Sequence, residues 1–177
     1  MIIFVILGSL VANYQNERLE ENLESNLIQF KPDELMSQKL KEYLESSNAG
    51  FTAEITKDKS PTMLKSEGFD TILEVDLKGW GIVRCVVSIQ SILREELTLK
   101  QAFLSLNIVK ARIRTLGRMH SIDDESIVWE REEIYRDKEC YELKDLETQP
   151  ELLVDILARS IQILAENTVN EILNTQE

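Results

Sequence analysis

The sequence has few of the residues that carry enzyme chemistry, with one histidine and two cysteines in 177 residues. Cys85 and Cys140 form no CxxC or Cys/His cluster, and a structural zinc site needs about four ligands. No G-x-S-x-G is present, and Arg84 stands where Gly79 and Gly81 would need a third glycine for a phosphate loop. We therefore expect neither an enzyme nor a cofactor or metal site.

His120 is the one histidine, and it precedes the acidic residues Asp123, Asp124 and Glu125. Neutral imidazole with carboxylate oxygens is a plausible set of metal ligands. However, polar residues of this kind are also what a tight turn between two strands requires. We favour the turn.

Positive charge is also in short supply. Lys and Arg number 20 against 32 Asp and Glu, which leaves a net charge of −12, and we find no basic stripe along the sequence. A charge of this sign and size repels phosphate backbones and anionic lipid headgroups. We therefore expect no nucleic-acid partner.

Long apolar runs are absent as well. Residues 1–7 are apolar, but a transmembrane helix needs about 20 such residues, so no transmembrane span is expected. The run lacks a positive flank, and no cysteine precedes Cys85, so the sequence contains no intact signal and no lipobox. Residues 1–30 are either a first strand or the remnant of an export signal, followed by a connection.

The two cysteines leave two possibilities open. Cys85 and Cys140 are either two buried thiols or the halves of one disulfide. A disulfide requires an oxidising compartment and Cα atoms within about 7 Å.

Apolar and polar residues alternate with a period of two in several stretches, which predicts strands. Such stretches occupy residues 51–56, 71–77 and 82–89, and a long hairpin spans residues 101–135 at the centre of the sheet. Gly117 and residues 121–126 are expected to form the hairpin turn. Gly79 and Gly81 indicate either a bulge in one strand or a turn between two.

Helical spacing of apolar residues predicts two helices, at 33–47 and 149–174. Thr148 and Glu151 have the spacing of a capping box at the start of the second. The predicted fold is a single α+β domain over residues 1–177, whose main body spans 32–177. Its mostly antiparallel sheet has four to five strands, and the two helices cover one face.

The long central strand carries more apolar residues than one covered face requires. Phe103, Val109 and Ile113 are expected on the face away from the helices, where another segment covers them or they form a partner surface. Trp80 is an aromatic residue expected at the rim of the sheet. These four residues are the candidate interaction surface.

Three stretches carry a family resemblance. They are residues 68–75 (GFDTILEV) ahead of Trp80, residues 127–130 (IVWE) after a polar turn, and residues 165–169 near the end of the last helix. With this order of elements, the chain resembles small bacterial cell-envelope lipoproteins, in the fold loosely shared by the TolB amino-terminal domain and auxiliary lipoproteins of ABC-type transport systems. It departs from them at Asn13, which follows residues 10–12 where such a protein would carry its lipidated cysteine.

The resemblance implies a non-catalytic accessory or structural module of an envelope complex. Such a module acts by contact with other envelope proteins or with further copies of itself. The implied location is periplasmic or associated with the outer membrane, with a cytoplasmic location as the alternative. The alternative function is a carrier that holds a small apolar or lipid ligand between helices and sheet.

Overall fold

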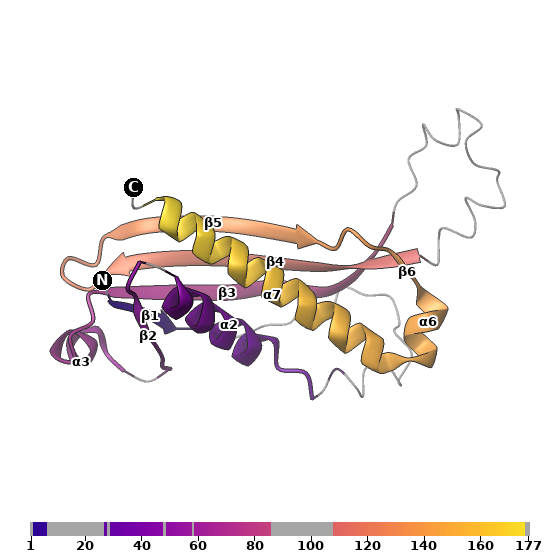
Figure 1. Cartoon of the computed structure of the whole chain (residues 1–177), viewed down its shortest axis with the longest axis horizontal. Helices are drawn as coiled ribbons and strands as arrows, with labels where there is room; N and C mark the ends of the chain where they lie inside the picture. The colour runs from indigo at the N-terminus through magenta and orange to yellow at the C-terminus, as the bar shows by residue number, and fades with distance from the viewer. Residues whose placement is uncertain are drawn as a thin grey trace, which may run out of the picture.

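This computed structural model describes residues 2–6, 27, 29–47, 49–57, 59–85 and 108–175, and the statements below concern those residues. One sheet runs the length of the molecule, and two helices lie across one of its faces (Figure 1). The predicted α+β class, with a long carboxy-terminal helix packed on the sheet, is confirmed.

The sheet has the strand order β2-β1-β3-β4-β5, and β6 pairs with the end of β4. β1 lies parallel to both β2 and β3, whereas β3, β4 and β5 are antiparallel. The helix α2 (Pro32–Ser46) between β1 and β2 allows their parallel pairing, because parallel neighbours need a long crossover. The strands are β1 (Ile2–Ile6), β2 (Thr52–Ile55), β3 (Thr71–Arg84), β4 (Ile108–Ser121), β5 (Ile127–Arg136) and β6 (Tyr141–Glu142).

β3 is one strand with a bulge, which decides between the two alternatives that the sequence left open. Leu77 pairs with Thr115, and the register shifts by one residue before Gly79 pairs with Arg114. The extra residue changes which positions face the helices. Trp80 and Ile82 therefore continue the buried series that Leu77 ends.

Gly117 lies inside β4, so the prediction that it belongs to the turn is wrong. A Cβ atom at this position would lie 2.6 Å from Cζ3 of Trp129, whose ring covers the glycine from the neighbouring strand. The missing side chain makes room for the aromatic ring. The turn itself comes later, at residues 122–126, where Glu125 has a φ of 56°.

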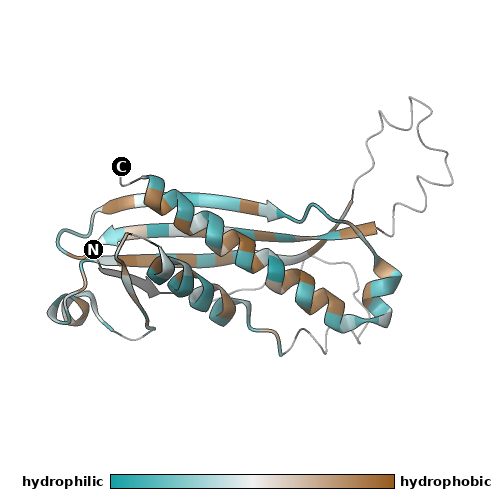
Figure 2. Ribbon diagram, viewed as in Figure 1, coloured by the Kyte–Doolittle hydropathy of each residue, from teal (hydrophilic) through white to brown (hydrophobic). Residues whose placement is uncertain are grey.

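Four helices have described bounds: α2 (Pro32–Ser46), α3 (Pro61–Ser66), α6 (Leu143–Thr148) and α7 (Pro150–Asn174). α7 lies along the sheet beside α2, and its apolar stripe is visible in Figure 2. The main core joins the two helices to the strands through fully buried side chains such as Leu40, Leu73 and Leu164. At about 25 cal/mol per Å² of apolar surface, this burial is the largest stabilising contribution.

The predicted capping box at the start of α7 is not formed. Thr148 Oγ1 donates to the carbonyl oxygens of Lys144 and Asp145, so it closes the last turn of α6. Gln149 is the N-cap residue of α7 and makes no side-chain capping bond. Pro150 lies in the first turn of α7, where its missing N–H would have no partner within the helix in any case.

Candidate functional site

The three described residues of the predicted interaction surface, Trp80, Val109 and Ile113, lie on the covered face of the sheet. Val109 and Ile113 are 4% and 0% exposed, on the face of β4 that α7 covers. Their assignment to the uncovered face is wrong, because the odd-numbered residues of β4 turn toward the helices. Trp80 is half-buried on the same covered face, with its ring 5.6 Å from that of Phe30. Phe103 lies outside the described residues.

His120 stands apart from the acidic turn. It projects from β4 toward Glu74 of β3, with Nε2 3.7 Å from the carboxylate. In the turn, Asp123 forms an ion pair with Lys65, and Asp124 accepts hydrogen bonds from Ser126. Within the described part of the chain, no three His, Cys, Asp or Glu residues gather closely enough to hold a metal ion.

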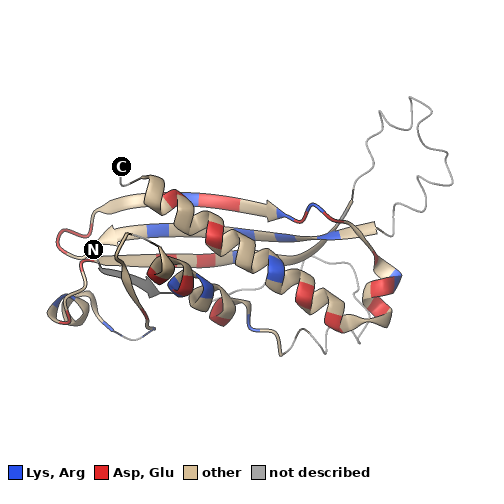
Figure 3. Ribbon diagram, in the orientation of Figure 1, with Lys and Arg blue, Asp and Glu red and all other residues tan. Residues whose placement is uncertain are grey.

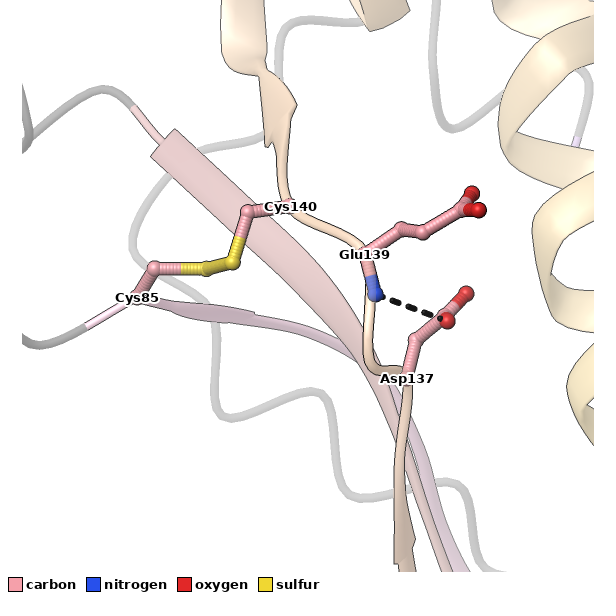
Figure 4. The surroundings of a disulfide bond; sticks show 4 residues. All are labelled: Cys85, Asp137, Glu139 and Cys140. Atoms are coloured by element: carbon pink, nitrogen blue, oxygen red, sulfur yellow. Dashed lines mark hydrogen bonds between the residues drawn. A yellow bond between two sulfur atoms is a disulfide. The ribbon is translucent and has the colours of Figure 1, made fainter.

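Cys85 and Cys140 are joined in a disulfide, with their Cα atoms 6.7 Å apart (Figure 4). It links the end of β3 to the connection between β5 and β6. Of the two states that the sequence left open, the structure therefore has the paired one. Asp137 and Glu139, on the same connection, point away from the disulfide.

Arg159 of α7 holds the same connection from the other side. Its guanidinium lies 2.9 Å from Asp137 Oδ2 and 3.1 Å from Glu139 Oε2, and it also donates to the hydroxyl of Tyr141. Hydrogen bonds to Asp137 and Tyr141 raise the pKa of Arg159. Hydrogen bonds from Tyr141 and Arg159 lower the pKa of Glu139. The connection is thus tied both to β3 and to the long helix.

The sheet face opposite α2 and α7, which we call the open face, is charged. It carries the even-numbered residues of β4 and their neighbours on β3 and β5, and α3 packs only at its end, around Ile72 and Ile122. Basic residues mark β4, and acidic residues mark β5, as Figure 3 shows. Arg114 forms an ion pair with Glu132, and Arg118 forms one with Glu130. This stripe was not expected from the sequence, although its positive charges are two residues apart, a spacing that a strand places on one side.

β5 is an edge strand whose outer backbone groups have no strand partner among the described residues. Ala111 O accepts a hydrogen bond from Asp137 N, so the odd-numbered residues of β4 bond to β5. Ile108 O accepts one from Cys85 N, so the even-numbered residues of β4 bond to β3 instead. Consequently, the outward N–H and C=O groups of β5 are those of Glu130, Glu132, Ile134 and Arg136.

Exposed apolar side chains gather on this edge strand. Among the described residues, the large hydrophobic side chains that remain exposed are Met63 and three on β5: Ile127 (56%), Val128 (48%) and Ile134 (42%). Three such residues on one free edge are unusual, since edges are normally protected by charge. The charged residues between them keep the strand from being uniformly apolar.

A shallow, open groove of about 500 Å³ lies between α2 and the start of α7. Phe30, Leu35 and Val154 give it apolar surface, but four charged residues share the lining: Lys31, Glu34, Glu151 and Asp155. This lining does not favour a purely apolar ligand. The carrier function stays a prediction.

No helix in the described ranges is both long and apolar enough to cross a bilayer.

Comparison with known proteins found no matching family model and no matching curated protein. Among solved structures, the chain is similar to protein XCC0632 from Xanthomonas campestris, of family model DUF330, at 12% identity and a TM-score of 0.47. That match covers 81% of this chain and 62% of the other, so the chain spans less than two thirds of that protein.

A putative neuraminyllactose-binding hemagglutinin homolog from Helicobacter pylori is similar at 16% identity and a TM-score of 0.48, covering 99% of this chain and 81% of the other. A putative lipoprotein from Caulobacter crescentus is similar at 11% identity and a TM-score of 0.31, covering 84% and 96%. One of these three structures is described as a putative lipoprotein, and none of them is TolB. At these scores none of them assigns a function to the chain.

Proposed function

We propose that the chain is a non-catalytic module of the bacterial cell envelope that binds another protein along β5. The observation that carries this proposal is the gathering of Ile127, Val128 and Ile134 on a strand whose outer edge is free within the described structure. An extended segment of a partner can pair with such an edge through backbone hydrogen bonds, while the exposed side chains provide specificity.

A photo-crosslinking residue at position 134, introduced in the native host, tests this contact. We expect a discrete crosslinked protein at this position and none at position 63, where Met63 is 52% exposed but lies on α3. Met63 is therefore a matched control for exposure alone. Equal crosslinking at both positions, or none at either, contradicts a docking role for β5.

The substitution Glu132→Pro separates backbone pairing from side-chain contact. Proline removes an outward N–H that β4 does not use, and edge strands tolerate it. We expect the position-134 crosslink to disappear in this variant. Glu132→Gln is the control, because it also removes the carboxylate that pairs with Arg114 and keeps the N–H. Loss of the crosslink in both variants points to the ion pair instead of strand addition.

An exported location is the second part of the proposal. The disulfide between Cys85 and Cys140 supports it, because such bonds persist in oxidising compartments and are rare in the bacterial cytoplasm. Fractionation combined with thiol labelling provides the test. We expect the native protein outside the cytoplasm with both thiols blocked before reduction. A cytosolic product with two free thiols would overturn this part.

A further inference from the structure

The open face holds a close pair of like charges that the rest of the face lacks. On β4 and β5, Arg118 pairs in register with Glu130, and the two form an ion pair. Six residues earlier on β4, Arg112 is in register with Arg136. Both pairs are of the type without mutual hydrogen bonds, in which facing side chains approach most closely. Like charges at such a position destabilise a sheet unless something offsets them.

No anion from the described chain offsets this pair. Arg112 Nε is buried and has no hydrogen-bond partner there. Lys110 lies two residues from Arg112 on the same face, and none of Lys110, Arg112 and Arg136 forms an ion pair with any described residue. Glu142, in register with Ile108 on this face, does not bond to Lys110. Three cations that have no ion-pair partner in the described part of the chain thus occupy neighbouring positions in a protein of net charge −12.

The neighbouring strand leaves room beside these cations. Gly81 is in register with Arg112, and Gly79 is in register with Arg114, so β3 has no side chain opposite either arginine. A Cβ atom at Gly79 would meet nothing within 4 Å. The positions of β3 that face Arg112 and Arg114 on this side of the sheet therefore carry no side chain.

We propose that Arg112, Arg136 and Lys110 form a binding site for a phosphate group. Two adjacent guanidinium forks and one ammonium match the oxygens of a phosphate, which accept paired N–H donors. A bound phosphate would neutralise the facing arginines. The group belongs either to a soluble phosphate compound or to a phospholipid headgroup. The site lies on the open face, and it does not depend on a protein docked along β5.

Titration with inorganic phosphate against sodium chloride at equal ionic strength tests the site, read from the side-chain Nε–Hε signals of the arginines by NMR. We expect saturable shifts at Arg112 and Arg136 with phosphate, and unchanged signals at Arg114 and Arg118, whose carboxylate partners are in place. Equal shifts with chloride would mean charge screening alone and would overturn the proposal.

Arg136→Glu is the informative variant, because it places a carboxylate opposite Arg112, as Glu130 lies opposite Arg118. We expect the melting temperature to stay level or rise, while phosphate affinity falls by about tenfold or more through loss of a charge-assisted contact. Arg114→Gln is the control, and it keeps the affinity of the wild type. Phosphate binding that survives both Arg136→Glu and Arg112→Gln excludes this site.

Vesicles of phosphatidylcholine with and without phosphatidylglycerol distinguish the two sources of phosphate. Cosedimentation that needs phosphatidylglycerol and is lost in Arg112→Gln identifies a lipid headgroup. Binding of inorganic phosphate without cosedimentation identifies a soluble compound. If neither inorganic phosphate nor vesicles bind in a way that depends on Arg112, the proposal is wrong. That result would not bear on the proposed protein contact along β5.

Discussion

Gly117 leaves room for the indole of Trp129, which reaches over it from the neighbouring strand β5. We predict that Gly117→Ala is destabilising by about 1–3 kcal/mol, the usual cost of overpacking. The reason is that the new methyl group would overlap the ring, 2.6 Å from Cζ3. Urea unfolding followed by circular dichroism gives the free-energy difference.

Gly79→Ala is the matched control for Gly117→Ala. Gly79 is also a strand glycine, but a Cβ atom there would meet nothing within 4 Å. We expect it to change stability by less than Gly117→Ala, or to stabilise slightly through reduced freedom of the unfolded chain. Equal losses at the two positions would show that the ring contact with Trp129 is not the cause.

At the scale of the element, β5 carries neighbouring carboxylates with opposite pKa shifts. Glu133 faces the helices, where burial and then the nearby charge of Glu171 raise its pKa. Glu132 faces the other way, where the hydrogen bond from Arg114 lowers its pKa. The alternation of a strand therefore gives adjacent acidic residues different environments.

Glu133→Gln should stabilise the protein at neutral pH. A raised pKa means that the folded state binds the proton more tightly than the unfolded state does, so ionisation of Glu133 costs stability as the pH rises above its ordinary value of 4.5. The gain should vanish in acid, once the carboxyl is protonated in both states. Urea unfolding across a pH series measures it.

Glu132→Gln should show the opposite sign. The lowered pKa of Glu132 stabilises the folded state when the pH is above the ordinary pKa of 4.5. That contribution is lost as the pH falls through the lowered pKa. The variant should be slightly less stable than the wild type at neutral pH and equal to it in strong acid. Identical pH profiles for the two glutamine variants would contradict the assignment of their faces.

For the whole molecule, the disulfide ties the connection between β5 and β6, residues 137–140, to β3, and Arg159 ties it to α7. The disulfide joins residues separated by 55 positions, which restricts the unfolded chain. We predict that reduction lowers the free energy of unfolding by about 2–4 kcal/mol. Urea unfolding with and without a phosphine reductant measures the change.

The double variant Cys85→Ser/Cys140→Ser is the control for that experiment. It should match the reduced wild type in stability and should not respond to the reductant. A wild type that is equally stable before and after verified reduction would mean that the bond does not constrain folding. Arg159 and the packing of α7 would then hold the connection by themselves.

Local patterns in the sequence located most of the long helices and strands. Apolar periodicity located α2, β2, β3 and α7 to within a residue or two at most ends, since periods of 3.6 and 2 are read from local order. The order of these predicted helices and strands also indicated the α+β class, and the sequence showed no familiar catalytic motif. Two glycines next to Trp80 left a bulge and a turn equally open, because both need the same residues.

The face that each of these elements presents depends on contacts between segments far apart in the sequence. Val109 and Ile113 lie under α7, and Gly117 lies under an indole ring, because register across β4 sets the inner side. A shift of one residue in register exchanges the two faces of a strand, and no local pattern reports it when both faces carry apolar residues. The same register aligned Arg112 with Arg136 and left Ile134 on a free edge, and both candidate sites depend on that alignment.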